Sequence, residues 1–278
     1  MRIASEAVSI DPDQSGVALT PQSLAKETFC ASPPSARRAW MTYEAAQRIV
    51  SSSKILRRLT LGVYSRLELL ILKGHKSHIA LNSLRRCRRG AESLLSANES
   101  FLLYSVVCAQ SGLGGAMAEV GVYQGTSAQI ICEAKRHCPL YLFDTFSGLP
   151  QPGGDETRML KPGQYAAQLS AVRTRLAGYS GVHFCPGIFP QSAVGIDGAR
   201  FSLVHLDADL YTSTLAGLEY FYPRMIPGGI IIAHDYSTLP GVMRAFAEFL
   251  KESDEAVIEL PSTQAMIVVG DPARLRRN

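Results

Sequence analysis

Short apolar runs alternate with amphipathic stretches along the second half of the chain. Runs that suit strands occur at 116–122, 140–144, 181–185, 201–207, 229–234, 256–260 and 265–269. Apolar residues spaced three or four positions apart predict helices at 126–136, 164–177, 212–222 and 242–251. Strands interleaved with helices in this way predict an α/β fold with a mainly parallel, doubly wound sheet.

The last two candidate strands have almost no helix between them. A connection this short suits a hairpin, whereas a parallel crossover needs a dozen or more residues. We therefore expect a seven-stranded sheet that contains one antiparallel strand at this end.

The first third of the chain has a different pattern. Residues 1–35 are polar, contain Pro21, Pro33 and Pro34 and lack sustained periodicity, which predicts a flexible segment. Residues 36–98 carry apolar positions at helical intervals between basic ones, which predicts a basic helical extension ahead of an α/β domain at 99–278. A helix expected at 43–72 could pack on the chain's own sheet or pair with a second copy, so a homo-oligomer stays open.

Composition narrows the class of protein. With 46% apolar and 19% charged residues, the chain should fold as a globular protein, and no apolar run is long enough for a transmembrane segment. The first residues lack the pattern of a secretory signal, and the six cysteines are scattered, which together predict a cytoplasmic protein with reduced thiols. The net charge is +4, and the basic cluster at 85–89 has no accompanying recognition pattern, so we expect no nucleic-acid partner.

A glycine turn follows the first strand, in the sequence EVGVYQGTS at 119–127. Such a turn lets a ligand approach the backbone at the start of a helix. A dinucleotide site would show GxGxxG, whereas this chain has ExGxxxG, which offers the carboxylate of Glu119. A carboxylate there would repel a pyrophosphate but could hold the ammonium group of a methionine moiety, which favours S-adenosylmethionine.

The second strand ends at Asp144, where a carboxylate can accept hydrogen bonds from both ribose hydroxyls. The alternative is a turn or cap aspartate, because Gly148 and Pro150 follow closely. The glycine turn upstream favours the ribose interpretation.

Three potential metal ligands lie at the ends of the fourth and fifth strands: Asp207 in HLDADLY, and His234 and Asp235 in PGGIIIAHDY. The carboxyl ends of parallel strands share one edge of a sheet, so these side chains should meet and form a divalent metal site. An isolated DxD motif would equally suit a glycosyltransferase, but here it follows ExGxxxG, and that order favours methyl transfer.

Taken together, the motifs EVGVYQGTS, LFDTFSGLP, HLDADLY and PGGIIIAHDY resemble those of the macrocin O-methyltransferase family. The resemblance implies a Rossmann-like class I methyltransferase fold and an S-adenosylmethionine-dependent O-methyltransferase that acts on a hydroxyl of a sugar or glycosylated natural product. It implies metal binding by Asp207 and Asp235. The residues that the resemblance implies at the cofactor are Glu119, Gly121, Val122, Tyr123, Gly125, Ser127, Asp144, Thr145, Gly187, Ile188 and Asp207.

His234 departs from the family pattern, which has an aspartate at this position. Because magnesium prefers oxygen ligands, an imidazole should shift the preference from magnesium towards a transition metal such as manganese. The other two interpretations are that His234 has become a base or that the metal site has decayed.

The mechanism that we expect has Asp207, or His234, accept the proton of a substrate hydroxyl while that oxygen attacks the sulfonium methyl. Two other functions compete with this one: a DxD-type glycosyltransferase, and a non-catalytic protein that keeps the methyltransferase fold.

Overall fold

The computed structural model of the chain describes residues 54–90, 92–251, 253 and 255–270. The segment 1–35, which the sequence predicts to be flexible, and the first part of the predicted helical extension lie outside the described residues. The described residues belong to one compact unit that begins at Ser53.

A seven-stranded sheet forms the centre of this unit, in the order β3-β2-β1-β4-β5-β7-β6. Strands β1 to β5 are parallel, and β7 runs antiparallel to both of its neighbours, which confirms the predicted sheet. The strands are β1 Ala116–Val120, β2 Leu140–Asp144, β3 Val182–Pro186, β4 Phe201–Leu206, β5 Met225–Ala233, β6 Ile258–Glu259 and β7 Ala265–Val268.

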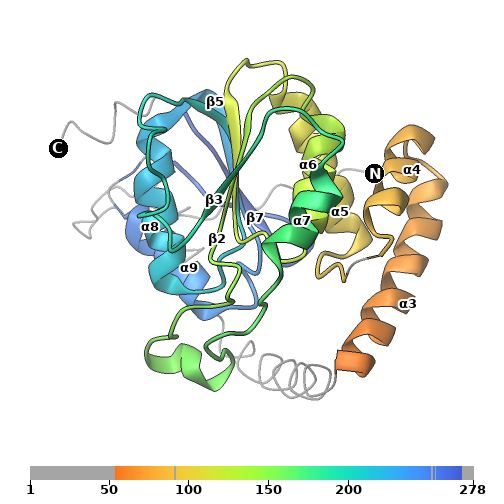
Figure 1. Cartoon of the computed structure of the whole chain (residues 1–278), viewed down its shortest axis with the longest axis horizontal. Coiled ribbons are helices and arrows are strands. Elements are labelled where there is room, and N and C mark those ends of the chain that lie inside the picture. Colours follow the sequence, from red (N-terminus) through yellow and green to blue (C-terminus); the bar gives the residue numbers. More distant parts are fainter. Residues whose placement is uncertain (1–53, 91, 252, 254, 271–278) are drawn as a thin grey trace, which may run out of the picture. The chain divides into compact units, whose positions relative to one another are not determined.

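Helices cover both faces of the sheet (Figure 1). One face carries α5 Ala97–Gln110, α6 Thr126–Ala134 and α7 Leu169–Leu176, and the other carries α8 Tyr211–Phe221 and α9 Pro240–Phe249. Two helices of the predicted extension, α3 Lys54–Lys73 and α4 His78–Cys87, pack outside α5 and α6. Short 3-10 helices, η1 Gly154–Arg158 and η2 Tyr222–Arg224, complete the described elements.

Two hydrophobic cores lie between the sheet and its helices. In β1 and β4 every side chain is buried, because the strands are covered on both sides, and this explains why most of their residues are apolar. Met117 and Leu203 belong to the core under α5 and α6, whereas Ala118 and Val204 belong to the core under α8 and α9. Successive side chains of a strand thus point into opposite cores, and this determines which side chains reach each face of the sheet.

Most predicted elements are present, and two of them begin four or five residues from the predicted position. Strand β5 begins at Met225 rather than at residue 229, and Gly228 and Gly229 exchange backbone hydrogen bonds with Val269 beyond the end of β7. Helix α7 begins at Leu169 rather than at residue 164, because Gln164 is bound into the preceding segment through its contact with Leu149.

The arginine cluster has a packing role in the structure. Arg86 forms an ion pair of 2.7 Å with Glu133 on α6. Arg88 donates hydrogen bonds to Ser65 on α3 and to Ser100 on α5, so it joins three helices. These contacts give Arg86 and Arg88 a role in packing the helices.

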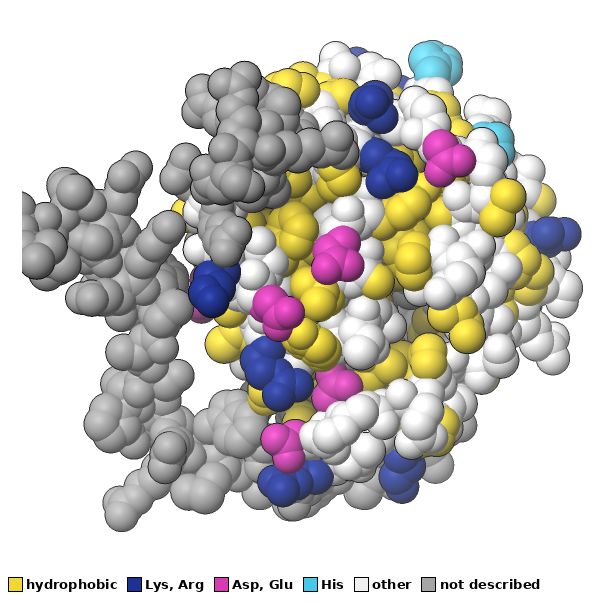
Figure 2. Space-filling model, turned by 90° about the vertical axis from the view of Figure 1, so that its left-hand side faces the viewer, with side chains coloured by type: hydrophobic (Ala, Val, Ile, Leu, Met, Phe, Trp, Pro, Cys, Tyr) yellow, Lys and Arg dark blue, Asp and Glu magenta, His cyan; other side chains and the backbone are white. Residues whose placement is uncertain are grey.

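The face that carries α8 and α9 shows acidic, basic and apolar side chains interspersed rather than a field of one sign (Figure 2). Among the residues that the structure describes, no helix is both long and apolar enough to cross a membrane.

Candidate active site

Most of the predicted site residues lie at the edge of the sheet where β1 to β5 reach their carboxyl ends. Asp207 N donates to the Val120 carbonyl at 2.8 Å, and His234 N donates to the Leu206 carbonyl at 2.9 Å. Gly187 N donates to the Asp144 carbonyl at 2.9 Å. The ends of neighbouring strands are therefore joined directly, and the candidate cofactor and metal residues share this edge.

The glycine turn is required by the packing of the chain itself. Gly121 has φ of 88°, and a β-carbon there would collide with the carbonyl oxygen of Asp207. Gly125 has φ of 77°, and a β-carbon there would meet the side chain of Val172 on α7 at 2.8 Å. Both positions thus need glycine for backbone conformation and close packing, whether or not a ligand is bound.

Asp144 fastens this turn to the end of β2. Its Oδ2 accepts hydrogen bonds from the backbone N–H groups of Val122 at 2.7 Å and Tyr123 at 2.9 Å. Its Oδ1 accepts one from Phe146 at 2.6 Å. Asp144 therefore stabilises a turn, as the alternative interpretation of this residue predicted. A bound ribose would have to share the carboxylate with these backbone donors.

Glu119 lies inside the sheet rather than at its edge. Its Oε1 is 2.9 Å from Nδ1 of His205 on β4, and both side chains are fully buried. Glu119 Oε2 and His205 Nε2 have no hydrogen-bond partner among the described residues. Burial raises the pKa of Glu119, although His205 and Ser127 oppose that rise.

Other predicted cofactor residues are partly engaged with the chain. The Thr145 hydroxyl donates to the Gly148 carbonyl at 2.7 Å, and the Tyr123 hydroxyl donates to Glu92 at 3.2 Å. Ser127 is buried in the first turn of α6, whereas Ile188 beyond β3 is 58% exposed. Ile188 thus offers an open apolar surface beside Asp144 and Gly187.

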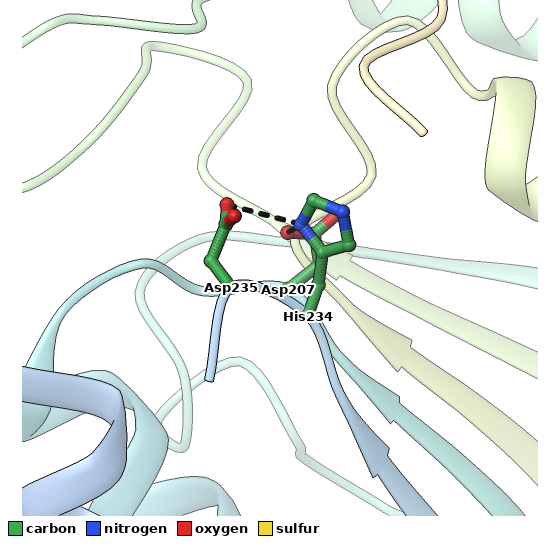
Figure 3. A group of neighbouring side chains, drawn as sticks. All are labelled: Asp207, His234 and Asp235. Carbon is green, nitrogen blue, oxygen red and sulfur yellow. Dashed lines mark ion pairs between the residues drawn. The ribbon is translucent and has the colours of Figure 1, made fainter. Parts of the chain in front are cut away.

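Asp207, His234 and Asp235 come together as predicted. His234 Nδ1 is 3.1 Å from Asp207 Oδ1 and 3.0 Å from Asp235 Oδ2. Both carboxylates approach the same ring nitrogen, and the other nitrogen points away from them (Figure 3). Among the described residues, neither ring nitrogen of His234 has a partner with hydrogen-bond geometry. The contacts with Asp207 and Asp235 are therefore ion pairs rather than hydrogen bonds.

A third carboxylate, Glu99, lies on the far side of the ring. Its Oε2 is 3.7 Å from His234 Nε2, beyond hydrogen-bond distance but within reach of an ion pair. Glu99 is held by the backbone N–H of Ser96, in the capping box of α5, and by the Thr263 hydroxyl at 2.7 Å. The S-x-x-E pattern signals a helix start, but no pattern in the sequence places that glutamate beside His234.

Charges in this cluster shift one another's protonation. Burial disfavours a charged His234 ring, but Asp207 and Asp235 outweigh it and raise the pKa of His234 well above its ordinary value. Burial also opposes ionisation of Asp207 and Glu99, yet His234 lowers the pKa of each. Without a metal, a cationic His234 therefore balances carboxylates on both sides of its ring.

Asp209, the second aspartate of the DxD motif, has the opposite shift. Burial raises the pKa of Asp209, and repulsion from Asp207 and Asp235 adds to the rise. Its φ of 60° is rare for a residue other than glycine. A carboxyl group that holds its proton so readily is a further acid–base candidate, which the sequence interpretation had not singled out.

The donor set fits a divalent metal. One atom from each of Asp207, His234 and Asp235 lies within 4.8 Å of the others, and the set is two oxygens and one nitrogen. The unaligned Nδ1 of His234 could serve as a ligand once it has lost its proton. A set of this kind suits manganese, iron, cobalt or zinc better than magnesium.

The position of these residues also fits a nucleotide-type cofactor. The glycine turn leads into α6, whose N-cap Gly125 provides no side-chain cap, so the first N–H groups of that helix can face a ligand. Open α/β sheets bind ligands at this edge, beyond the carboxyl ends of their strands.

Comparison with known proteins yields a family match. The model of the family described as Macrocin-O-methyltransferase (TylF) matches residues 103–263. The 8-demethyl-8-(2,3-dimethoxy-alpha-L-rhamnosyl)-tetracenomycin-C 4'-O-methyltransferase of Streptomyces olivaceus is 32% identical over 142 residues, which cover 45% of this chain and 54% of that protein. The demethyldecarbamoylnovobiocin O-methyltransferase of Streptomyces niveus is 27% identical over 158 residues, which cover 51% and 60%. The chain therefore matches little more than half the length of these curated relatives.

Solved structures with a similar fold include two methyltransferases. The structure of NovP has a TM-score of 0.60 and 20% identity, and covers 76% of this chain and 100% of its own. The structure of CalS11, described as a calicheamicin methyltransferase, has a TM-score of 0.55 and 18% identity, and covers 74% and 92%. At such identities the likeness concerns the fold alone.

Proposed function

The chain belongs to the macrocin O-methyltransferase family and has the class I methyltransferase fold, and from this we propose that it transfers a methyl group from S-adenosylmethionine to a hydroxyl of a sugar or glycosylated natural product. The observation that carries the proposal is the cluster of Asp207, His234 and Asp235. It lies at the carboxyl end of the sheet, where the glycine turn also lies. Family membership argues against the DxD glycosyltransferase alternative.

The substrate class rests on the relatives. The Streptomyces olivaceus relative is named for an acceptor that carries a dimethoxy-rhamnosyl group, and the Streptomyces niveus relative for a novobiocin precursor. Both names describe methyl transfer to oxygen. A rhamnose-type sugar joined to a larger aglycone is accordingly the first acceptor to test.

We assign the cofactor to the region beyond the carboxyl ends of β1, β2 and β3. Asp144 would share its carboxylate with the ribose, and Gly187 and Ile188 would lie near the adenine. The N-terminus of α6 would face the methionine end. Because Glu119 is buried against His205, its contribution to the ammonium group would be electrostatic or would require rotation of its side chain.

The acceptor hydroxyl would lie over the Asp207 cluster. A bound divalent metal would supply positive charge that makes the hydroxyl more acidic. Asp207 would accept the hydroxyl proton as the oxygen forms its bond to the methyl carbon and the carbon–sulfur bond breaks. The chain's main contribution would be to hold donor and acceptor in line, because the sulfonium donor is already activated.

His234 determines which version of this chemistry applies. As a metal ligand it must be neutral, so metal binding would expel the proton that its carboxylate neighbours stabilise. Without a metal, the protonated ring would provide a fixed positive charge at the same place. The first version predicts manganese-dependent turnover, and the second predicts turnover in the presence of a chelator.

The deciding experiment combines binding and turnover. We would titrate the full chain with S-adenosylhomocysteine by calorimetry, first with EDTA and then with magnesium, manganese or zinc. We would then follow methylation of p-nitrophenyl α-L-rhamnoside and of larger rhamnosides by mass spectrometry. Micromolar binding supports the cofactor class, whereas no binding under any condition would overturn the proposed function and favour a non-catalytic role.

A further inference from the structure

A long connection runs from Thr145 to Gln168, between β2 and α7. Connections longer than about 15 residues that lack strands or long helices are uncommon in compact domains and often serve function. This segment, which we call the β2–α7 segment, contains the short helix η1 and begins at the carboxyl end of β2. It therefore begins at the edge of the sheet that carries the candidate site.

The two ends of the β2–α7 segment are joined at its base. Leu149 N donates to the Gln164 carbonyl at 2.8 Å, and Gly163 N donates to the Leu149 carbonyl at 2.9 Å. Gly148 lies so close to the Gly163 carbonyl that a β-carbon would collide with it. The base is thus closed, and residues 150–162 form a tip that extends from it.

Beyond its base, the segment contacts two parts of the site. The ring of Tyr165 packs edge-on against the ring of Tyr123 in the glycine turn, with centroids 5.8 Å apart. In the tip, Glu156 Oε1 accepts a hydrogen bond of 2.6 Å from Tyr211 N, directly after the DxD turn. Because these contacts lie beyond the ends of β1 and β4, the segment bridges neighbouring strand ends at the site.

The environment of Glu156 is shaped to hold a carboxylate. Tyr211 is the first residue of α8, and the N-cap residue Leu210 provides no side-chain cap, so Glu156 caps this helix from another part of the chain. Gly241 in the first turn of α9 leaves room for the carboxylate, since a β-carbon there would collide with Glu156 Oε1. The N-terminal turns of two helices thus meet one acidic side chain.

We propose that Glu156 is a positioning residue that latches the β2–α7 segment over the acceptor side of the site and holds the DxD turn in place. As a statement about the acceptor it rests on the proposed function. The turn itself is tight, with φ of 60° at Asp209 and a hydrogen bond of 2.6 Å from Leu210 N to the Ala208 carbonyl. The cap on Tyr211 follows immediately, so its loss would free both the segment and the turn.

Limited trypsin digestion tests the latch directly. Within the β2–α7 segment trypsin can cut only after Arg158, because Lys161 precedes a proline. Arg158 is exposed and lies two residues from Glu156, so the rate at which a new terminus at Met159 forms reports how often the tip opens. We expect Glu156→Ala to raise this rate about tenfold, the effect of one charge-assisted hydrogen bond. Glu156→Gln, which keeps an acceptor oxygen, should fall between Ala and the wild type.

Gly241→Ala provides an independent way to open the latch with Glu156 intact. The added methyl group should push the carboxylate off Tyr211 N and raise the cutting rate about as much as Glu156→Ala does. In the double variant the two effects should not add fully, because both substitutions remove the same hydrogen bond from Tyr211 N. Full additivity, or a wild-type rate in Glu156→Ala, would overturn the latch.

Matched controls separate the latch from general changes of charge or helix propensity. Glu219→Gln removes the same charge from the exposed face of α8, and Gly178→Ala adds a methyl group in open space. Neither should change the rate of cutting after Arg158.

Binding and kinetics separate this inference from the proposed function. Absence of S-adenosylhomocysteine binding in the wild type would defeat the proposed function and leave the digestion result standing. With p-nitrophenyl α-L-rhamnoside, Glu156→Ala should raise KM for the acceptor about tenfold and lower kcat less. If Glu156→Ala is cut faster but keeps the wild-type KM for the acceptor, Glu156 only holds the tip in place. That result would contradict its role as a positioning residue.

Discussion

Two histidines on neighbouring strands, His205 and His234, lie close to carboxylates in different surroundings. His205 is inside the sheet, where it pairs with one carboxylate, and the pair has no exposed surface. His234 is at the carboxyl end of the sheet, where three carboxylates surround its ring and two of them are partly exposed. The inner pair is closed and nearly neutral when both partners are charged, whereas the outer cluster has an excess of negative charge.

This difference indicates which cluster can take part in chemistry. A closed buried pair resists change, because altering either partner leaves the other without compensation. A cluster with excess negative charge at an accessible edge favours a cation, which a proton on His234 or a bound metal can provide. Similar residue types therefore form a closed structural pair in one place and a candidate ligand site in the other.

The largest expected effect comes from the outer cluster. Asp207→Ala should lower turnover about a thousandfold, because it removes both a metal ligand and a proton acceptor. Binding of S-adenosylhomocysteine, measured by calorimetry, should weaken far less. Turnover near the wild-type level would show that the outer cluster is not the reaction centre.

Changing the inner pair should affect stability. His205→Leu would leave Glu119 buried and unpaired, at a cost of about 3–5 kcal/mol in the free energy of unfolding. Because burial raises the pKa of Glu119 in the folded state, stability should fall as pH rises from the unfolded pKa of about 4.3 to the raised folded value. Urea denaturation at pH 5 and pH 8 measures this difference. Equal losses at both pH values would contradict the assignment of the cost to a charged Glu119.

Glu99, which lies near the second ring nitrogen of His234, provides a further test of the comparison. Glu99→Gln should weaken manganese binding by about tenfold, because ligating histidines depend on the partner of their second nitrogen. Glu68→Gln is the matched control. Glu68 is also buried, and its carboxylate accepts a hydrogen bond from the backbone N–H of Ala97 at the start of α5. Equal losses of affinity in the two variants would assign the effect to helix capping.

The smallest expected change concerns metal identity. His234→Asp should shift the preference from manganese towards magnesium by about tenfold, because the donor set becomes all oxygen. Competitive titration of the two ions against the wild type and the variant measures the ratio. If the ratio stays constant, His234 does not contact the metal.

Much of the fold followed from the sequence because local pattern and tertiary position agree. Strands such as β2 are short apolar runs between turns, and their parallel order follows from the intervening helices. The hairpin at the end was visible from the missing helix. The start of α7 was missed by five residues, because the pattern at Gln164 is helical while its backbone hydrogen bonds belong to the β2–α7 segment.

The site was predictable where a residue ends a strand. Asp144, Asp207 and His234 do so, and parallel strands place their ends together. Glu99 and Glu156 were not predictable, because they reach the site from a helix start and a connection whose path depends on tertiary packing. Glu119 lies at the expected position in sequence, but its side chain turns into the sheet, because His205 on the next strand provides its partner.

The hydrogen bond between Thr263 and Glu99 joins the start of α5 to the hairpin between β6 and β7, the last described hairpin of the chain. During synthesis the ribosome releases the glycine turn and the DxD turn well before this hairpin. The contact between Thr263 and Glu99 can form only after β7 has inserted next to β5. One support of the charged centre thus forms late, so a partly made chain can hold most of its sheet before Glu99 has all its contacts.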